Sequence, residues 1–427
     1  ADLNLFASNT CSGCNLDGSN GCSNIFFGSC AGKAMTSGAC NIFLGRYAGQ
    51  NATEATRSIA IGHKAIGTGV ATCFLNIAIG NCALLSLTSA RDNVVVGSSS
   101  GCDITQGELN AIFGHEAGMQ LSTQTQNTLI GSFAGRFAAS GGNTIVGSNA
   151  ARCMTTGEGN IAIGLCAYRG DNASAGTGDN NVVIGKQAVI NAYGAHSNVI
   201  LGFYAGYCIC SGSNNIAIGK CAMRGTSAIT GSLNITIGHK AGCKLTSGSC
   251  NAVLGTYAGQ CLTSGTCNVF IGTNAGFCNC SATGNVFLGT AAGKCTTSGA
   301  CNTFLGFYTS KNNTTGCFNV SIGSGVDVAS ATGSKQLAIG CNTGRWVTGD
   351  SNFKVGISSN ITAPRAELEV AGSVHANRFF QNPTSLDTTT SFPADGGAAV
   401  NGGVFGPYTI NTGVTFTIGS GSTFTII

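Results

Sequence analysis

Twenty glycines that follow short apolar stretches recur along this chain at an almost constant interval. Fourteen of the 19 intervals between them are 17 residues long, and the others are 16, 16, 18, 19 and 21 residues. The glycines are Gly28, Gly45, Gly62, Gly80, Gly97, Gly114, Gly131, Gly147, Gly164, Gly185, Gly202, Gly219, Gly238, Gly255, Gly272, Gly289, Gly306, Gly323, Gly340 and Gly356. A fixed short period is typical of stacked repeats, in which each repeat forms one coil. The sequence therefore predicts an all-β parallel solenoid, or β-roll, of about 20 coils of 17 residues.

The same short pattern precedes each of these glycines. Asn stands four residues before the glycine in 18 of the 20 repeats, and a large apolar residue stands directly before it in all of them. The two positions in between are each apolar in 17 of 20 repeats. Three consecutive apolar residues predict a strand that is covered on both faces. The Asn residues predict a ladder of side-chain hydrogen bonds between coils, as stacked Asn residues form in cross-β arrangements.

The segment after each glycine predicts the rest of the coil. Ala stands three residues after the glycine in 15 of 20 repeats, and a turn such as Thr-Ser-Gly at 36–38 follows it. The periodic glycine suits a corner that needs positive φ, and the small Ala side chain suits a second, crowded strand. We therefore expect two short strands and two corners in each coil.

Alternation along the strand predicts where its two apolar faces point. The side chain two residues before the glycine points away from those one and three residues before it. We expect the side chains one and three residues before the glycine to fill the coil. We expect the side chains two residues before it to form an apolar stripe outside, which marks an interface between identical chains. The candidate trimer interface residues are Phe26, Phe43, Ile112, Phe270, Phe287 and Phe304. The alternative is a wider coil that covers the stripe with a second sheet of its own.

Cysteines are abundant and unevenly placed. The chain has 23 of them, an odd number that cannot all pair within one chain. Three pairs bracket short turns and are candidate structural disulfides: Cys261 with Cys267, Cys295 with Cys301, and Cys243 with Cys250. For these pairs a disulfide and two buried free thiols are equally compatible with the sequence, and we expect the remaining cysteines to be free thiols.

Composition narrows the function. Charged residues make up 8% of the chain, against about 25% in ordinary proteins, and the net charge is +4. This charge predicts no basic patch, and we identify no Lys/Arg cluster with interleaved aromatics, so we expect no nucleic-acid partner. No apolar run reaches the ~20 residues of a membrane span. We find no constellation of nucleophile and base, paired carboxylates or metal ligands, and therefore expect no enzyme activity, no metal and no cofactor.

The iterated motif resembles a known family. The stretch Asn41-Ile42-Phe43-Leu44-Gly45-Arg46-Tyr47-Ala48-Gly49 is similar to the head repeats of YadA-type trimeric autotransporter adhesins. It looks still more like the 17-residue version of that repeat in phage tail fibres. The resemblance covers residues 24–356 and implies a left-handed parallel β-roll with three chains side by side.

Two further resemblances follow the repeats. The segment 364–376, Pro-Arg-Ala-Glu-Leu-Glu-Val-Ala-Gly-Ser-Val-His-Ala, is similar to one found late in phage fibres. The end of the chain is similar to short C-terminal β-tails of cyanophage structural proteins. We therefore divide the chain into an N-terminal cap or degenerate first coil (1–23), a solenoid shaft (24–356), a connector (357–405) and a β-hairpin or knob (406–427).

These observations favour a structural role. We expect a homotrimeric virion appendage, a tail fibre or spike, that is located on the virion or extracellularly. Its expected partners are its own copies, other virion proteins, and a host-surface glycan or protein. The alternative is a bacterial surface adhesin or a subunit of an extracellular filament.

Overall fold

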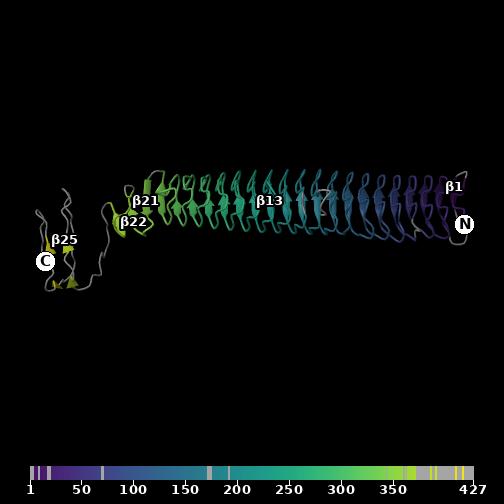
Figure 1. Ribbon diagram of the computed structural model, residues 1–427. Helices are drawn as coiled ribbons and strands as arrows, with labels where there is room; N and C mark the ends of the chain where they lie inside the picture. The colour runs from purple at the N-terminus through teal and green to yellow at the C-terminus, as the bar shows by residue number, and fades with distance from the viewer. Residues whose placement is uncertain are drawn as a thin grey trace. The chain divides into compact units, whose positions relative to one another are not determined.

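The computed structural model describes most of the chain as two separate units. The described residues are 4–7, 10–16, 21–68, 72–170, 176–190, 193–342, 344–358, 361, 363–371, 385–386, 390–391, 409–410 and 416–417. The first unit spans Ala1–Ala371 and the second spans Gly372–Ile427. The first unit is a regular stack of coils that follow one another in chain order (Figure 1). Among the described residues all regular elements are strands.

Twenty parallel strands, one from each coil, make up most of the 23-stranded sheet of the first unit. They are β1 (Leu5–Ala7), β2 (Ile25–Phe27), β3 (Ile42–Leu44), β4 (Ile59–Ile61), β5 (Ile77–Ile79), β6 (Val94–Val96), β7 (Ala111–Phe113), β8 (Thr128–Ile130), β9 (Thr144–Val146), β10 (Ile161–Ile163), β11 (Val182–Ile184), β12 (Val199–Leu201), β13 (Ile216–Ile218), β14 (Ile235–Ile237), β15 (Ala252–Leu254), β16 (Val269–Ile271), β17 (Val286–Leu288), β18 (Thr303–Leu305), β19 (Val320–Ile322) and β20 (Leu337–Cys341). Each pairs in parallel with the next, and equivalent repeat positions face each other, as in Phe270 opposite Phe287. The prediction of a parallel solenoid of about 20 coils is confirmed.

Left-handed backbone conformations limit each strand from β1 to β19 to three residues. In one coil Cys250, Gly255, Tyr257 and Gly259 have φ values of 59, 133, 58 and 50°. Such residues cannot continue a pleated strand. Between them, backbone groups bond to neighbouring coils: Tyr257 N–H donates to His239 O of the preceding coil at 2.9 Å, and Gly259 N–H donates to Ala275 O of the following coil at 2.9 Å. The segment after the glycine is therefore a hydrogen-bonded turn, and the expected second strand around the Ala is wrong.

The core of the stack contains the middle residue of each strand from β2 to β19, and Ala338 of β20. Phe26, Phe43, Phe270, Phe287 and Phe304 are 0% exposed, and so is Ile112. Successive rings stack inside the coils, with centroids 5.0 Å apart for Phe270 and Phe287 and 4.8 Å apart for Phe287 and Phe304. The prediction that this set forms an external trimer interface is therefore wrong. Strand alternation alone allows either face to point inward, and the direction in which the turns close the coil selects this one.

The buried Asn ladder is confirmed. Asn268 donates from its backbone N–H and from Nδ2 to Asn251 Oδ1, each at 3.0 Å, and from Nδ2 to Ala282 O at 2.8 Å. Asn285 repeats this arrangement with Asn268 as the acceptor. The ladder starts at Asn4, whose Oδ1 accepts the Asn24 N–H at 2.8 Å, so the degenerate N-terminal segment does contain a first coil.

The stack ends where the chain reverses direction. β21 (Gly344–Gly349) pairs antiparallel with β20, β22 (Val355–Ile357) pairs antiparallel with β21, and β23 (Leu368–Val370) pairs in parallel with β22. Gly340 and Gly356 lack the positive φ that the preceding 18 periodic glycines have. The repeat that the sequence places before Gly356 is therefore part of a meander that covers the edge of β20, and not a further coil.

In the second unit the described residues form two short sheets. β24 (Ser385–Leu386) pairs in parallel with β26 (Thr409–Ile410), and β25 (Thr390–Ser391) pairs in parallel with β27 (Phe416–Thr417). Each of these sheets thus pairs a strand of the connector with a strand of the C-terminal tail. Apart from 409–410 and 416–417, the predicted hairpin or knob (406–427) lies outside the described residues.

Candidate functional site

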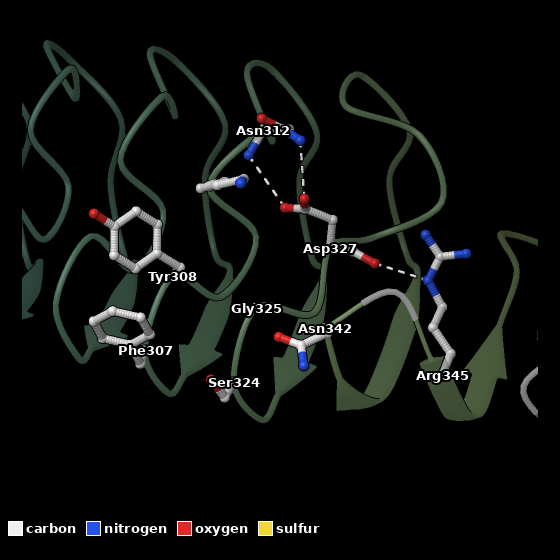
Figure 2. Close-up of a pocket in the computed structure, with 9 residues that line it drawn as sticks. Phe307, Tyr308, Asn312, Ser324, Gly325, Asp327, Asn342 and Arg345 are labelled. Carbon is white, nitrogen blue, oxygen red and sulfur yellow. Dashed lines mark hydrogen bonds between the residues drawn. The ribbon is translucent and has the colours of Figure 1, made fainter.

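An open pocket lies at the end of the stack, beside the chain reversal (Figure 2). It has a volume of about 710 Å³. It is lined by Phe307, Tyr308, Lys311, Asn312, Ser324, Gly325, Asp327, Asn342 and Arg345. These residues come from the turns of the last coils, at the first, second, fourth, fifth and sixth positions after a periodic glycine, and from β21. The reversal opens this space because no further turn stacks on these coils.

Two exposed aromatic rings form one wall of the pocket. Phe307 and Tyr308 directly follow Gly306, and they are 56% and 39% exposed. Their ring centroids lie 4.4 Å apart with an interplanar angle of 60°. Tyr308 has φ 54°, so the turn itself directs the ring out of the coil. The wall therefore offers flat apolar faces together with one hydroxyl group.

Fixed polar groups form the opposite wall. The Asp327 carboxylate accepts hydrogen bonds from Asn312 N–H at 3.2 Å and from Asn312 Nδ2 at 2.9 Å. Arg345 donates from Nε to Asp327 O at 2.8 Å and from Nη2 to Val328 O at 3.3 Å. The guanidinium thus binds backbone carbonyls of the last turn and keeps a positive charge there. Asp327 is the one carboxylate among the nine lining residues, whereas glycoside hydrolysis requires two.

A surface of cations and aromatic rings extends along the same side of the coils. We name it the cation–aromatic surface. It comprises Lys186, Lys220, Arg224, Lys240, Lys244, Lys294 and Lys311, with Phe203, Tyr204, Tyr207, Tyr257 and Tyr308. All follow a periodic glycine by one to six residues, so they belong to the turns and not to the strands. Lys311 and Tyr308 also line the pocket, and the two features are therefore continuous.

Contacts between coils hold this surface together. Lys186 Nζ and Lys220 Nζ lie 6.0 and 5.9 Å from the Phe203 ring centroid, from the coils on either side of it. The Arg224 guanidinium lies near two rings of the preceding coil, 5.5 Å from the Tyr204 ring and 5.9 Å from the Tyr207 ring. Lys240 Nζ lies 5.4 Å from the Tyr257 ring of the next coil. Within one coil, Lys311 Nζ lies 5.8 Å from the Tyr308 ring. These distances are in the range of cation–π attraction.

Sequence reasoning missed this surface because its residues are not contiguous. Lys186 and Lys220 stand 34 positions apart in the sequence, yet both directly follow a periodic glycine. In a solenoid with an interval near 17 residues, residues at one repeat position form a column. The cation–aromatic surface can be found in the sequence when charged residues are counted at each repeat position, and not by their density along the chain.

The bracketed cysteines do not form disulfides in the structure. Free thiols are present at all six candidate positions, Cys261, Cys267, Cys295, Cys301, Cys243 and Cys250. Their backbones are tied to different coils: Cys261 N–H donates to Phe277 O of the next coil, whereas Cys267 N–H donates to Ser249 O of the preceding one. The stacking of coils therefore determines the neighbours of each cysteine. The structure therefore contains the free thiols of the alternative, but none of the six is buried: three are exposed and three are partly exposed.

Among the described residues no group of three or more His, Cys, Asp and Glu side chains is placed to hold a metal ion. No described helix is long and apolar enough to cross a membrane. Comparisons with models of protein families, with curated proteins and with solved structures found no match for this chain.

Proposed function

We propose that this chain is the shaft of a virion appendage, a tail fibre or spike, in which three parallel copies associate along their strand faces. The observation that carries the proposal is a continuous apolar face with no charge along all 20 coils. It consists of the first and third residues of β1–β19 and the corresponding Leu337 and Ile339 of β20. These positions hold apolar residues except at Thr128, Thr144 and Thr303. We name it the strand face.

The side chains of the strand face are partly or fully exposed in the single chain. Phe27 is 61% exposed, and Leu288 and Leu305 are each 41% exposed. With a spacing of ~4.8 Å between parallel strands, 20 strands extend the face over roughly 90 Å. Contiguous exposed apolar patches of that size mark interfaces between proteins. Because every coil presents the same kind of face, a second and a third copy fit it in register.

Cyclic symmetry allows each copy to use the same face. The repeat's similarity to trimeric adhesin heads and phage fibres favours three copies over two. A trimeric rod provides mechanical reach, and three copies of any weak binding surface raise the avidity for a host surface. The proposed location is therefore the virion or the extracellular space, with other virion proteins at its ends.

The test is the oligomeric state of the full chain. Static light scattering should give three times the chain mass of 42.6 kDa. The triple variant Ile271→Asp, Leu288→Asp and Leu305→Asp introduces charges that are costly to desolvate in the interface, and it should give a lower mass. The matched control Thr256→Asp, Thr273→Asp and Thr290→Asp adds the same number of charges directly after Gly255, Gly272 and Gly289, in two of the same coils and the one before them. This control should remain trimeric. A monomeric wild-type protein, or a triple variant that stays trimeric, would contradict the proposed assembly.

A further inference from the structure

We infer that the cation–aromatic surface binds a linear anionic polysaccharide that lies along the coils. This inference deepens the attachment role in the proposed function and rests on it, because it names the chemistry of the surface that is attached. It does not require the strand face, since all of its residues lie on the turns.

Uncompensated charge is the first argument. From residue 180 to residue 326 the sequence contains no Asp or Glu, and all seven of its Lys and Arg residues belong to the cation–aromatic surface. Lys186, Lys220, Arg224, Lys294 and Lys311 are exposed. Earlier coils differ: Arg136 Nε lies 2.8 Å from Glu116 Oε2, and Arg91 Nε lies 3.1 Å from Glu108 Oε1. A one-signed surface of this kind attracts a partner of the opposite charge and raises its association rate.

Interleaved aromatic rings are the second argument. Phe203 lies between Lys186 and Lys220, and Tyr204 and Tyr207 lie beside Arg224. Phe203 is 36% exposed. Sugar rings have apolar C–H faces and polar edges. A flat aromatic ring can therefore pack against the face of a charged sugar, while the cations beside the ring bind the acid group at the edge of the sugar. Cations that served only for solubility would not need exposed aromatic neighbours.

The spacing of the charges selects the class of polymer. Eight coils, from that of Gly185 to that of Gly306, carry the seven cations. At ~4.8 Å per coil they cover roughly 34 Å, or about one cation every 5 Å. Duplex DNA carries one negative charge per ~1.7 Å, which this surface would leave largely unneutralised. A polysaccharide with one acid group on each sugar or on every second sugar has the sparser charge that fits.

The pocket provides an end to the binding surface. Tyr308 and Lys311 belong to both features, and beyond them Asn312, Asp327 and Arg345 present fixed donors and acceptors. Neutral hydroxyl groups of a sugar chain can bind these groups, whereas the single carboxylate disfavours an acid group there. We therefore place the polymer along the columns of cations, with one terminal sugar in the pocket.

The experiment measures binding of the full chain to alginate oligosaccharides, which carry one carboxylate per sugar, by isothermal titration calorimetry. Dextran serves as the neutral polymer, and a DNA duplex of equal length serves as the competing anion. We expect binding to alginate that weakens as salt is raised, weaker binding to DNA and none to dextran. Absence of alginate binding, or tighter binding to DNA, overturns the inference.

Two sets of variants assign the binding to this surface. Lys220→Ala, Arg224→Ala and Lys240→Ala together should weaken alginate binding by about tenfold or more, because each ionic contact contributes to affinity. Lys33→Ala, Arg46→Ala and Lys64→Ala remove cations from the same repeat positions in the first coils and should leave affinity unchanged. Equal losses in both sets would show nonspecific charge attraction and overturn the inference.

A further variant and an independent readout complete the design. Phe203→Leu with Tyr204→Leu keeps every charge and should still weaken binding, whereas unchanged affinity contradicts the role of the rings. Light scattering on the same samples reports the oligomeric state. Binding by a monomeric protein would refute the proposed trimer alone, and a trimer that does not bind alginate would refute this inference alone.

Discussion

The side-chain oxygen of Asn24 accepts two hydrogen bonds from Asn41, one from the backbone N–H at 3.0 Å and one from Nδ2 at 2.9 Å. Asn41 Nδ2 also donates to Ala55 O at 2.7 Å, in the turn 14 residues further along the chain. Each Asn in this arrangement is buried and links neighbouring coils through donors and acceptors that water cannot reach. The ladder therefore holds adjacent coils in register where backbone bonds alone would allow sliding.

Removing one member of the ladder should be costly. In the Asn268→Ala variant the Asn251 oxygen loses an Nδ2 donor, and the backbone and side-chain donors of Asn285 lose their acceptor. We expect a loss of about 1–3 kcal/mol in the free energy of unfolding for each buried polar group left unpaired. Chemical denaturation followed by circular dichroism measures it.

A natural break in the ladder supplies the control. At Ser58 the backbone N–H still donates to Asn41 Oδ1 at 2.9 Å, and Ser58 Oγ accepts the Asn76 N–H at 3.4 Å. Asn268→Ser should therefore cost less than Asn268→Ala. Equal losses for the two variants would contradict a role of the hydroxyl as a substitute acceptor.

The periodic glycines should not tolerate a side chain. Gly272 has φ 130°, and a Cβ there would lie 2.6 Å from the backbone C and O of Gly289 in the next coil. We expect Gly272→Ala to lower the free energy of unfolding by at least about 1–3 kcal/mol through backbone strain alone. Gly194 is the matched control, because its φ is not positive and a Cβ would meet only Thr177 Oγ1 at 3.8 Å. If both alanine variants unfold at the same denaturant concentration, the corner does not depend on glycine.

The stacked rings should behave as core residues. Phe287→Ala removes a fully buried ring from between Phe270 and Phe304, and we expect a loss of about 3–5 kcal/mol in the free energy of unfolding. Thr290→Ala, in the same coil, should change it little. A Phe287→Ala protein that keeps full stability but dissociates into single chains would place this ring at an interface after all.

The thiol of Cys102 should ionise at unusually high pH. Burial, followed by the neighbouring Asp103 carboxylate, raises its pKa from 9.0 to about 11. The unfolded chain therefore loses this proton at lower pH than the folded chain does, and the contribution of Cys102 to stability should fall between pH 9 and pH 11. Because the thiolate is the reactive form, iodoacetamide labelling of Cys102 should increase most steeply near pH 11. Mass spectrometry of the labelled peptides measures it, and a midpoint below pH 9 would contradict the burial of this group.

The repeat determined much of this protein without reference to its tertiary structure. The interval between glycines predicts the number of coils, and the Asn before each strand predicts the ladder, because both depend on contacts between equivalent positions in adjacent coils. Such contacts are local in a solenoid, so periodicity in the sequence becomes proximity in space. The repeat pattern also groups the core Phe residues as one set, but it does not predict whether their side chains point into the coil or out of it.

Only the tertiary structure decided which face of each strand points inward. Alternation makes Phe287 and Leu288 point to opposite sides, and both are apolar, so the sequence permits either arrangement. The left-handed residues after each glycine set the direction in which the chain closes the coil, and they also replace the expected second strand by a turn. The reversal at β21 and the column that brings Lys186 and Lys220 to either side of Phe203 likewise depend on how complete coils stack. These relationships arise between distant residues once the backbone has closed, and no local pattern of residue types specifies them.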